Sequence, residues 1–188
     1  ERVAVDLTEK TIDSQLVFEG GFLKVRRDRI RLPDGSESWR EYIRHPGAVA
    51  VLALTDDGRL VMERQYRYPA GREFLEIPAG KLDPGEAREQ CARRELMEET
   101  GYSAREWTFL GTAHPCIGYA DEQIHYFLAR GLTLSERQLD HGEFLEVVTL
   151  PLTEVIARTL NGAICDSKSL VGLYWLQAHL EGRMPGAV

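Results

Sequence analysis

GKLDPGEAREQCARRELMEETGY, residues 80–102, carries six carboxylates and a central Arg94, with a glycine near each end. On an α-helix with about 100° per residue, Glu95, Glu98 and Glu99 fall within one arc about 100° wide. Like charges at these spacings repel each other. The pattern therefore indicates either a solvated acidic face or a site for hard divalent cations, which prefer oxygen ligands and bind substrate phosphates as well.

The spacing of these residues follows a recognisable motif. Five residues separate Gly80 from Glu86, seven separate Glu86 from Arg94, and the rest of the motif follows Arg94 without a break as far as Tyr102. This pattern resembles the Nudix box, GX5EX7REUXEEXGU with U a bulky apolar residue, at every defined position. The resemblance implies an α/β fold, the Nudix α/β/α sandwich with a mixed sheet. It also implies hydrolysis of a nucleoside diphosphate linked to another moiety.

The same resemblance assigns the metal ligands and a structural pair. Glu95, Glu98 and Glu99 are the first-choice ligands for Mg²⁺, or for Mn²⁺ in its place. The family adds the backbone carbonyl just before the box glycine, which is Ala79 here. Two or more such ions lower the pKa of bound water and neutralise phosphoryl oxygens. Arg94 is expected to pair with box carboxylates and hold the loop against the helix, and we count it with Glu98 among the catalytic residues.

We expect the general base to come from outside the box, because carboxylates bound to metal have their lone pairs engaged. The segment Gly142–Val147 resembles the loop-to-strand segment whose glutamate positions or deprotonates water in the family. We favour Glu143 over Glu146, since Glu143 precedes the strand and can reach the substrate from a mobile loop. The alternative, in which Glu146 or a box residue acts as the base, stays open.

Outside the box, the chain most resembles the ADP-ribose pyrophosphatase group, over roughly residues 15–180. Gln65–Arg67 and Leu75–Gly80 look like its QxR and LExPAG segments, and Pro115 opens a loop like the one associated with ADP-ribose preference. The resemblance implies Mg²⁺-dependent hydrolysis of ADP-ribose to AMP and ribose 5-phosphate. Two alternatives are a pyrophosphatase for another nucleoside diphosphate sugar, such as GDP-mannose, and a non-catalytic nucleotide-sensing domain. The intact box glutamates argue against the nucleotide-sensing domain.

Three further residues are candidates for substrate binding. Arg67 is placed to clamp a substrate phosphate, although a strand-end arginine also serves as a surface salt-bridge partner. Trp39 and Arg44 lie where the group has an aromatic residue stacked on adenine and an arginine near the diphosphate. Trp39 has the alternative of simply covering a sheet edge.

The N-terminal part predicts a small antiparallel sheet of three strands, Leu16–Glu19, Phe22–Leu32 and Ser38–His45. These strands are poorly amphipathic, because neither face is continuously apolar. We therefore expect another surface to cover them. By resemblance, such a sheet is exchanged across a homodimer and contributes to the substrate's base pocket; an ordinary solvated meander is the alternative. His45-Pro46-Gly47 marks a boundary, which predicts an N-terminal extension at 1–45 and a Nudix domain at 46–188.

Hydrophobic patterning and turn signals predict the elements of the second part. The box helix is expected to start near Glu86 and to stop at Gly101. One face of the last helix, with Leu170, Leu173, Tyr174 and Leu180, is expected to pack in the core. The other expected elements are strands at Ala48–Leu54, Arg59–Arg67, Phe74–Ile77, Trp107–Ala113, Ile124–Ala129 and Phe144–Leu150, and helices at Leu152–Leu160 and Ser167–Leu180.

Composition limits the partners of the protein. The chain has 188 residues and a net charge of -7, which argues against a broad surface for nucleic acid or an anionic membrane. The apolar run Ala48–Leu54 is far too short to span a bilayer. Cys91, Cys116 and Cys165 are far apart in the sequence, so neither a disulfide framework nor a zinc site is indicated. We therefore expect a cytoplasmic protein.

Overall fold

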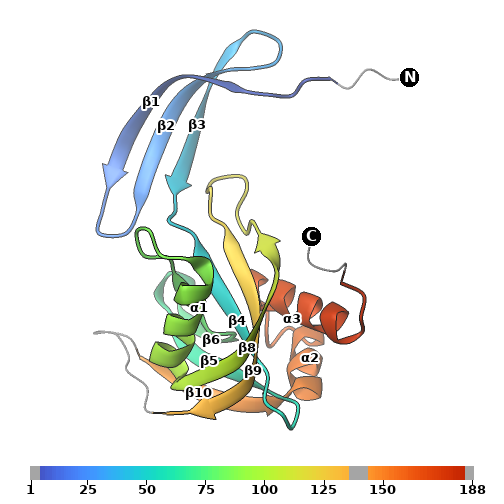
Figure 1. Ribbon diagram of the computed structural model, residues 1–188. Helices are drawn as coiled ribbons and strands as arrows, with labels where there is room; N and C mark the ends of the chain where they lie inside the picture. Colours follow the sequence, from blue (N-terminus) through green and yellow to red (C-terminus); the bar gives the residue numbers. More distant parts are fainter. Residues whose placement is uncertain (1–4, 136–143, 185–188) are drawn as a thin grey trace. The chain divides into compact units, whose positions relative to one another are not determined.

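The computed structural model describes residues 5–135 and 144–184, which fall into two compact units (Figure 1). The first unit contains the described residues up to His45 together with the segment Cys116–Glu122. The second contains Pro46–Pro115 and the described residues from Gln123 onward. The sequence boundary after His45 did not include Cys116–Glu122 in the first unit, because that segment lies far along the chain.

The first unit is an antiparallel sheet with the order β1 (Lys10–Glu19), β2 (Lys24–Arg31) and β3 (Glu37–Arg44). β1 starts six residues before the expected strand, because its charged and polar residues pair with β2 along their whole length. Cys116–Glu122 adds to the end of β3, where the Ile43 amide donates to the Tyr119 carbonyl at 2.8 Å and the Ile43 carbonyl accepts from Asp121 at 3.2 Å.

The second unit is built around a mixed sheet, as the sequence predicted. Its order is β7 (Ala79–Lys81), β4 (Ala48–Ala53), β9 (Ile124–Leu134) and β8 (Tyr102–Ala113). β4 and β9 are parallel, whereas β7 is antiparallel to β4 and β8 is antiparallel to β9. A further antiparallel sheet has the order β10 (Leu145–Pro151), β5 (Arg59–Arg67) and β6 (Arg72–Glu76).

β4 is buried on both faces, because it lies in the middle of an α/β/α sandwich. Ala50 and Leu52 pack in the core that includes residues of α2 (Leu152–Leu160) and α3 (Ser167–Leu180). Val49 and Val51 pack on the opposite face, against α1 (Arg88–Glu95). Figure 1 shows α1 on one side of the sheet and α2 and α3 on the other. Each buried side chain of this kind contributes about 1.5–3 kcal/mol.

Two details of the helices differ from the sequence predictions. α1 begins at Arg88 rather than near Glu86, because the Glu86 carboxylate accepts from the Asp83 amide at 3.1 Å and so belongs to the preceding turn. On α3, Leu173 lies in the core as expected, together with Leu176, whereas Leu170, Tyr174 and Leu180 are exposed. The core face is therefore rotated about Leu173 from the expected one, and Gly172 lies on it and allows close packing on Ile77 and Tyr126.

The helical segment that follows α1 is a π-helical turn, Leu96–Thr100, which ends at Gly101 in the left-handed region with φ 76°. The stop at Gly101 agrees with the sequence prediction. Single π-turns inserted at the end of an α-helix are frequent at functional sites. Among the described residues, no helix has the length and apolar character needed to cross a bilayer.

Candidate active site

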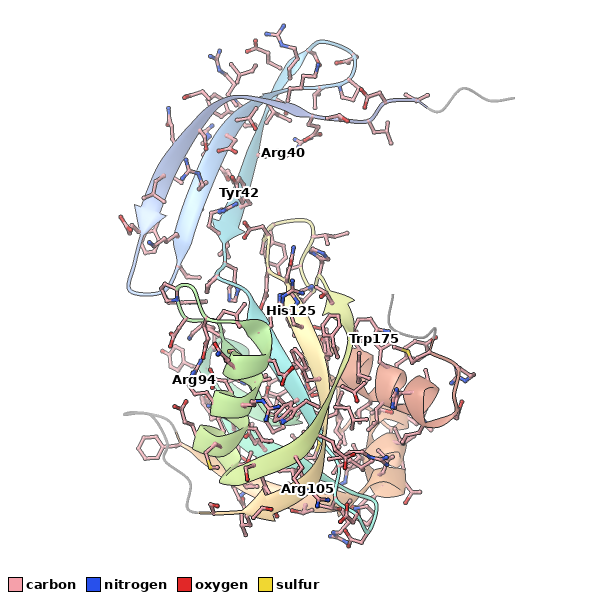
Figure 2. All side chains as sticks on the ribbon, viewed as in Figure 1. Arg40, Tyr42, Arg94, Arg105, His125 and Trp175 are labelled. Atoms are coloured by element: carbon pink, nitrogen blue, oxygen red, sulfur yellow. The ribbon has the colours of Figure 1, made fainter. Side chains whose placement is uncertain are left out.

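Arg94 is the hub of the box and is labelled on α1 in Figure 2. Its Nε and Nη2 donate to the two carboxylate oxygens of Glu86 at 2.9 and 3.0 Å, and Nη2 also donates to the Lys81 carbonyl at 3.2 Å. Its Nη1 lies 2.9 Å from Glu95 Oε1 and 2.9 Å from Glu98 Oε2. The hydrogen bonds from Arg94 lower the pKa of Glu86 to about 2. Arg94 therefore ties the loop before the helix to two of the box glutamates.

The Glu95 carboxylate lies directly on the backbone of Gly80. A Cβ added to Gly80 would lie 1.8 Å from the Glu95 carboxyl carbon, which is an impossible approach. Gly80 does not have a positive φ, so the glycine is needed here for space and not for backbone conformation. The position of the first box glutamate thus depends on the missing side chain at the box glycine.

Glu98 and Glu99 are neighbours in the π-turn, but their surroundings differ. Glu98 stays partly exposed and pairs with Arg94 at 2.9 Å. Glu99 turns inward, is 4% exposed, and accepts a hydrogen bond from the Ala79 amide at 3.2 Å. Two carboxylates, those of Glu95 and Glu99, are consequently brought to the short segment Ala79–Gly80, where the sequence placed a carbonyl ligand.

These donors fit a hard divalent cation that completes its shell with other oxygens. Within residues 5–135 and 144–184, no three Asp, Glu, His or Cys side chains form a ready-made metal cage. Mg²⁺ does not require one, because it usually binds through one or two carboxylates, waters and substrate phosphates. In the part of the chain that the structure describes, the buried Glu63 Oε1, beside Glu99, has no hydrogen-bond partner. An unpartnered carboxyl oxygen next to a predicted ligand is consistent with a cation site.

A second layer of buried charges lies behind Glu99. Glu63 on β5 and Glu76 on β6 are paired in the sheet register and are both 2% exposed. Burial and then the nearby Glu76 raise the pKa of Glu63 to about 8, and its carboxyl is hydrogen-bonded to that of Glu99. Glu76 accepts from Arg67 Nε at 2.7 Å and from Arg67 Nη2 at 2.8 Å, and it also pairs with Lys168.

This second layer was not among the sequence predictions. The signal for Glu63 was present, since Val61, two residues earlier on the same face of β5, is fully buried against the α1 side of the sheet. A carboxylate that follows the alternation onto a buried face is expected to have a function or a partner. Lys168 had no such signal, because charged residues are common in the first turn of a helix.

The remaining predicted residues lie in different parts of the chain. Trp39 and Arg44 are on β3 of the first unit. Trp39 is 44% exposed, and the guanidinium carbon of Arg27 lies 4.5 Å from the centroid of its ring. Arg44 pairs with Asp121 at 2.7 Å. Arg67 is on β5 of the second unit. Glu143 lies outside the described residues.

Two family models together match most of the chain. The NUDIX domain model matches residues 44–169, and the model for the Nucleoside diphosphate sugar hydrolase N-terminal domain matches residues 9–43.

Relatives with similar sequences span nearly the same length. An ADP-ribose pyrophosphatase of Bacillus subtilis (strain 168) is 42% identical over 173 residues, covering 91% of this chain and 94% of that protein. A methanol dehydrogenase activator of Bacillus methanolicus is 42% identical over 171 residues, covering 90% and 92%. The crystal structure of an ADP compounds hydrolase has the same fold, with a TM-score of 0.84 at 23% identity over 98% of this chain and 100% of that one.

Proposed function

Because the chain belongs to the Nudix hydrolase family, we propose that it hydrolyses the pyrophosphate bond of ADP-ribose to AMP and ribose 5-phosphate, using Mg²⁺. The observation that carries this proposal is the convergence of the Glu95 and Glu99 carboxylates on Ala79–Gly80. The similarity to the Bacillus subtilis ADP-ribose pyrophosphatase over 91% of the chain supports the choice of substrate.

The residues that would hold Mg²⁺ are Glu95, Glu98, Glu99 and the carbonyl of Ala79. When bound there, the metal supplies an acidic water and neutralises phosphoryl oxygens. Arg94 contributes by balancing the charge of the carboxylates and by keeping Glu98 in place.

Arg67 is proposed to bind a substrate phosphate. Its Nε and Nη2 are used by Glu76, so Glu76 fixes the guanidinium plane and leaves Nη1 for a further anion. The pKa of Arg67 is raised by its hydrogen bonds to Glu76, which keeps the guanidinium charged. A fixed, charged fork of this kind suits recognition of phosphate.

The base is proposed to be Glu143, and the structure supports this choice indirectly. Glu146, its competitor, lies on β10 and its carboxylate is bound by Arg64. The pKa of Arg64 is raised by this pairing. A carboxylate that is engaged by an arginine has to give up this ion pair before it can turn toward an attacking water.

We expect Glu143→Gln to lower kcat by about 10²-fold or more, because an amide cannot accept the proton of the attacking water. Single-turnover kinetics of Glu143→Gln, with Glu146→Gln as the matched control, measures the effect. Binding of Mg²⁺ should fall less in Glu143→Gln than in variants of the box. Impairment of Glu146→Gln alone would show that the base is misassigned.

Trp39 and Arg44 are proposed to serve the substrate's base and diphosphate within a homodimer. Exposed apolar side chains on β1, including Leu16, Val17 and Phe18, support the need for a covering partner. We also propose a cytoplasmic location, since all three cysteines are free thiols and reducing compartments keep thiols in this state.

The proposed substrate is tested by incubating the protein with a panel of nucleotide sugars and identifying the products. With Mg²⁺, ADP-ribose should give AMP and ribose 5-phosphate with a kcat/KM about tenfold or more above that for GDP-mannose. A preference for GDP-mannose would establish the alternative pyrophosphatase. Tight binding of nucleotide without turnover, in either Mg²⁺ or Mn²⁺, would instead establish a sensing domain.

A further inference from the structure

Lys168 holds a central place in the buried charge layer behind the candidate site. It lies in the first turn of α3, where its side chain is 14% exposed. Its Nζ pairs with the carboxylate of Glu76 and lies 3.1 Å from Asp166 Oδ1. Asp166 is itself fixed, because it caps α3 by accepting from the Ser169 amide at 3.0 Å. The ammonium is therefore anchored at both sides.

The first turn of α3 binds two successive residues, the last of β6 and the one after it, in the segment that leads to the box. Lys168 binds the Glu76 side chain, and the hydroxyl of the neighbouring Ser169 accepts from the Ile77 amide at 3.0 Å. Both Glu76 and Ser169 are buried. Two residues beyond Ile77 lies Ala79, whose amide binds Glu99. The first turn of α3 thus sets the path of the chain into the site.

Charge balance shows why a cation is needed at this point. Glu63, Glu76 and Glu99 are buried side by side, and within the described residues the cations placed against Glu76 are Arg67 and Lys168. If Lys168 were replaced by a neutral residue, Arg67 would be the remaining described cation against Glu76. A buried carboxylate that loses one of its two cations is left undercompensated and moves toward the other. That movement changes how Arg67 is held.

We propose that Lys168 is a positioning residue for phosphate recognition, acting through Glu76 on the guanidinium of Arg67. This inference rests on the proposed function, in which Arg67 binds a phosphate of the substrate. Lys168 shares the Glu76 carboxylate with Arg67 and so holds the guanidinium plane, with Nη1 directed away from Glu76. Lys168 does not contact substrate, and no other described residue links α3 to this arginine through one carboxylate.

Steady-state kinetics of Lys168→Met tests the inference. We expect KM for the best nucleotide sugar of the panel to rise about tenfold, because small displacements of a binding group have effects of this size or larger. The kcat value should change less, since loss of uniform binding raises KM. Lys168→Arg, which keeps the charge, should lie between the wild type and Lys168→Met. Arg158→Met, which removes an exposed ion pair with Glu154 on α2, is the matched control with unchanged KM.

A double-mutant cycle separates positioning from a purely structural role. Arg67→Lys raises KM by itself, and adding Lys168→Met should cause little further rise, because both changes remove the same interaction. Fully multiplicative effects, or an unchanged KM in a folded Lys168→Met, would overturn the proposal. If Lys168→Met shows no cooperative thermal transition, Lys168→Gln takes its place in the cycle, with the same expected coupling.

The failure of the proposed function would be visible separately. If the wild type hydrolyses no nucleotide sugar, the proposed reaction is wrong, and the cycle is then repeated with the affinity for ADP measured by calorimetry. Coupled losses of ADP affinity in Arg67→Lys and Lys168→Met would still support the positioning role. Unchanged ADP affinity in Lys168→Met would overturn it.

Discussion

At the scale of single residues, environment separates the roles of chemically identical carboxylates. Glu86 is held ionised by two bonds from Arg94, whereas burial next to Glu76 raises the pKa of Glu63 to about 8. Glu99 is hydrogen-bonded to Glu63 and accepts from the Ala79 amide. Pairs of carboxyl groups whose environments push their pKa values apart are typical of catalytic sites.

Removing one box charge at a time tests the metal assignment. We expect Glu98→Gln and Glu99→Gln each to lower turnover by about 10²-fold or more, because the amide keeps the size of the side chain and loses the charge that a divalent ion needs. Glu89→Gln is the matched control, since Glu89 is exposed on the same helix and pairs only with Arg93 within the described residues. Thermal unfolding should show intact folds. Near-wild-type rates in both box variants at saturating Mg²⁺ would contradict the assignment of Glu98 and Glu99 as metal ligands.

The approach of Glu95 to Gly80 makes a second residue-scale prediction. A methyl group at position 80 has to displace the Glu95 carboxylate, since the two would lie within 2 Å or so of one another. We therefore expect Gly80→Ala to weaken Mg²⁺ binding in calorimetry and to lower the melting temperature. Gly21→Ala, where the added methyl meets nothing within 4 Å, should change neither. Wild-type Mg²⁺ affinity in Gly80→Ala would contradict the geometry.

At the scale of elements, the sequence predicted those that carry strong local signals. β5, α2 and α3 have the predicted bounds, because turns at Asp56-Asp57-Gly58 and Asn161-Gly162 and clear periodicity delimit them. β7 was missed, because its three small or polar residues become a strand only by pairing with β4. The π-turn was also missed, since it changes the phase of the helix without any change in the residue pattern. The spacing of the motif predicts the box ligands, which stay a prediction, whereas the contacts of Lys168 with the buried carboxylates emerge only from packing.

The loop that precedes α1 is expected to lose its anchor in acid. The anchor is Glu86, whose pKa of about 2 in the folded protein lies below the ordinary value of 4.5. Glu86 therefore stabilises the fold above about pH 4.5, and this stabilisation is lost as the pH falls toward 2. Urea unfolding should show the wild type to be more stable than Glu86→Gln at neutral pH, with the difference narrowing in acid.

Glu89→Gln again provides the control for that experiment. Glu89 forms an exposed pair with Arg93, and such pairs contribute about 0–1 kcal/mol, so its effect should be small at every pH. A stability difference between wild type and Glu86→Gln that stays constant from neutral pH to pH 3 or so would show that the ionisation of Glu86 is not linked to folding.

At the scale of the whole molecule, the N-terminal sheet leaves several large apolar side chains exposed. Leu16, Val17 and Phe18 are each about half exposed on β1. Small sheets generally need a covering partner for stability. This observation supports the homodimer proposed above, with β1 in the covered surface.

Sedimentation velocity tests the dimer directly. We expect a dimer at micromolar concentration and a shift toward monomer in Leu16→Glu, because a carboxylate placed in an apolar interface costs several kcal/mol unless it is paired. Gln15→Glu adds the same charge to a neighbouring exposed position that is already polar, and it should leave the dimer intact. A wild-type protein that is monomeric and fully active would contradict the homodimer proposal.

The membership of Cys116–Glu122 in the first unit limits how the protein can be divided. The end of β3 bonds to this segment through Ile43, yet the segment is inserted between β8 and β9 of the second unit. The N-terminal sheet is therefore not an independent module that can be cut off or grafted onto another catalytic domain by one crossover. A recombinant that exchanges the sheet also has to exchange the insertion 116–122. We therefore expect these two separate stretches of the chain to be inherited together.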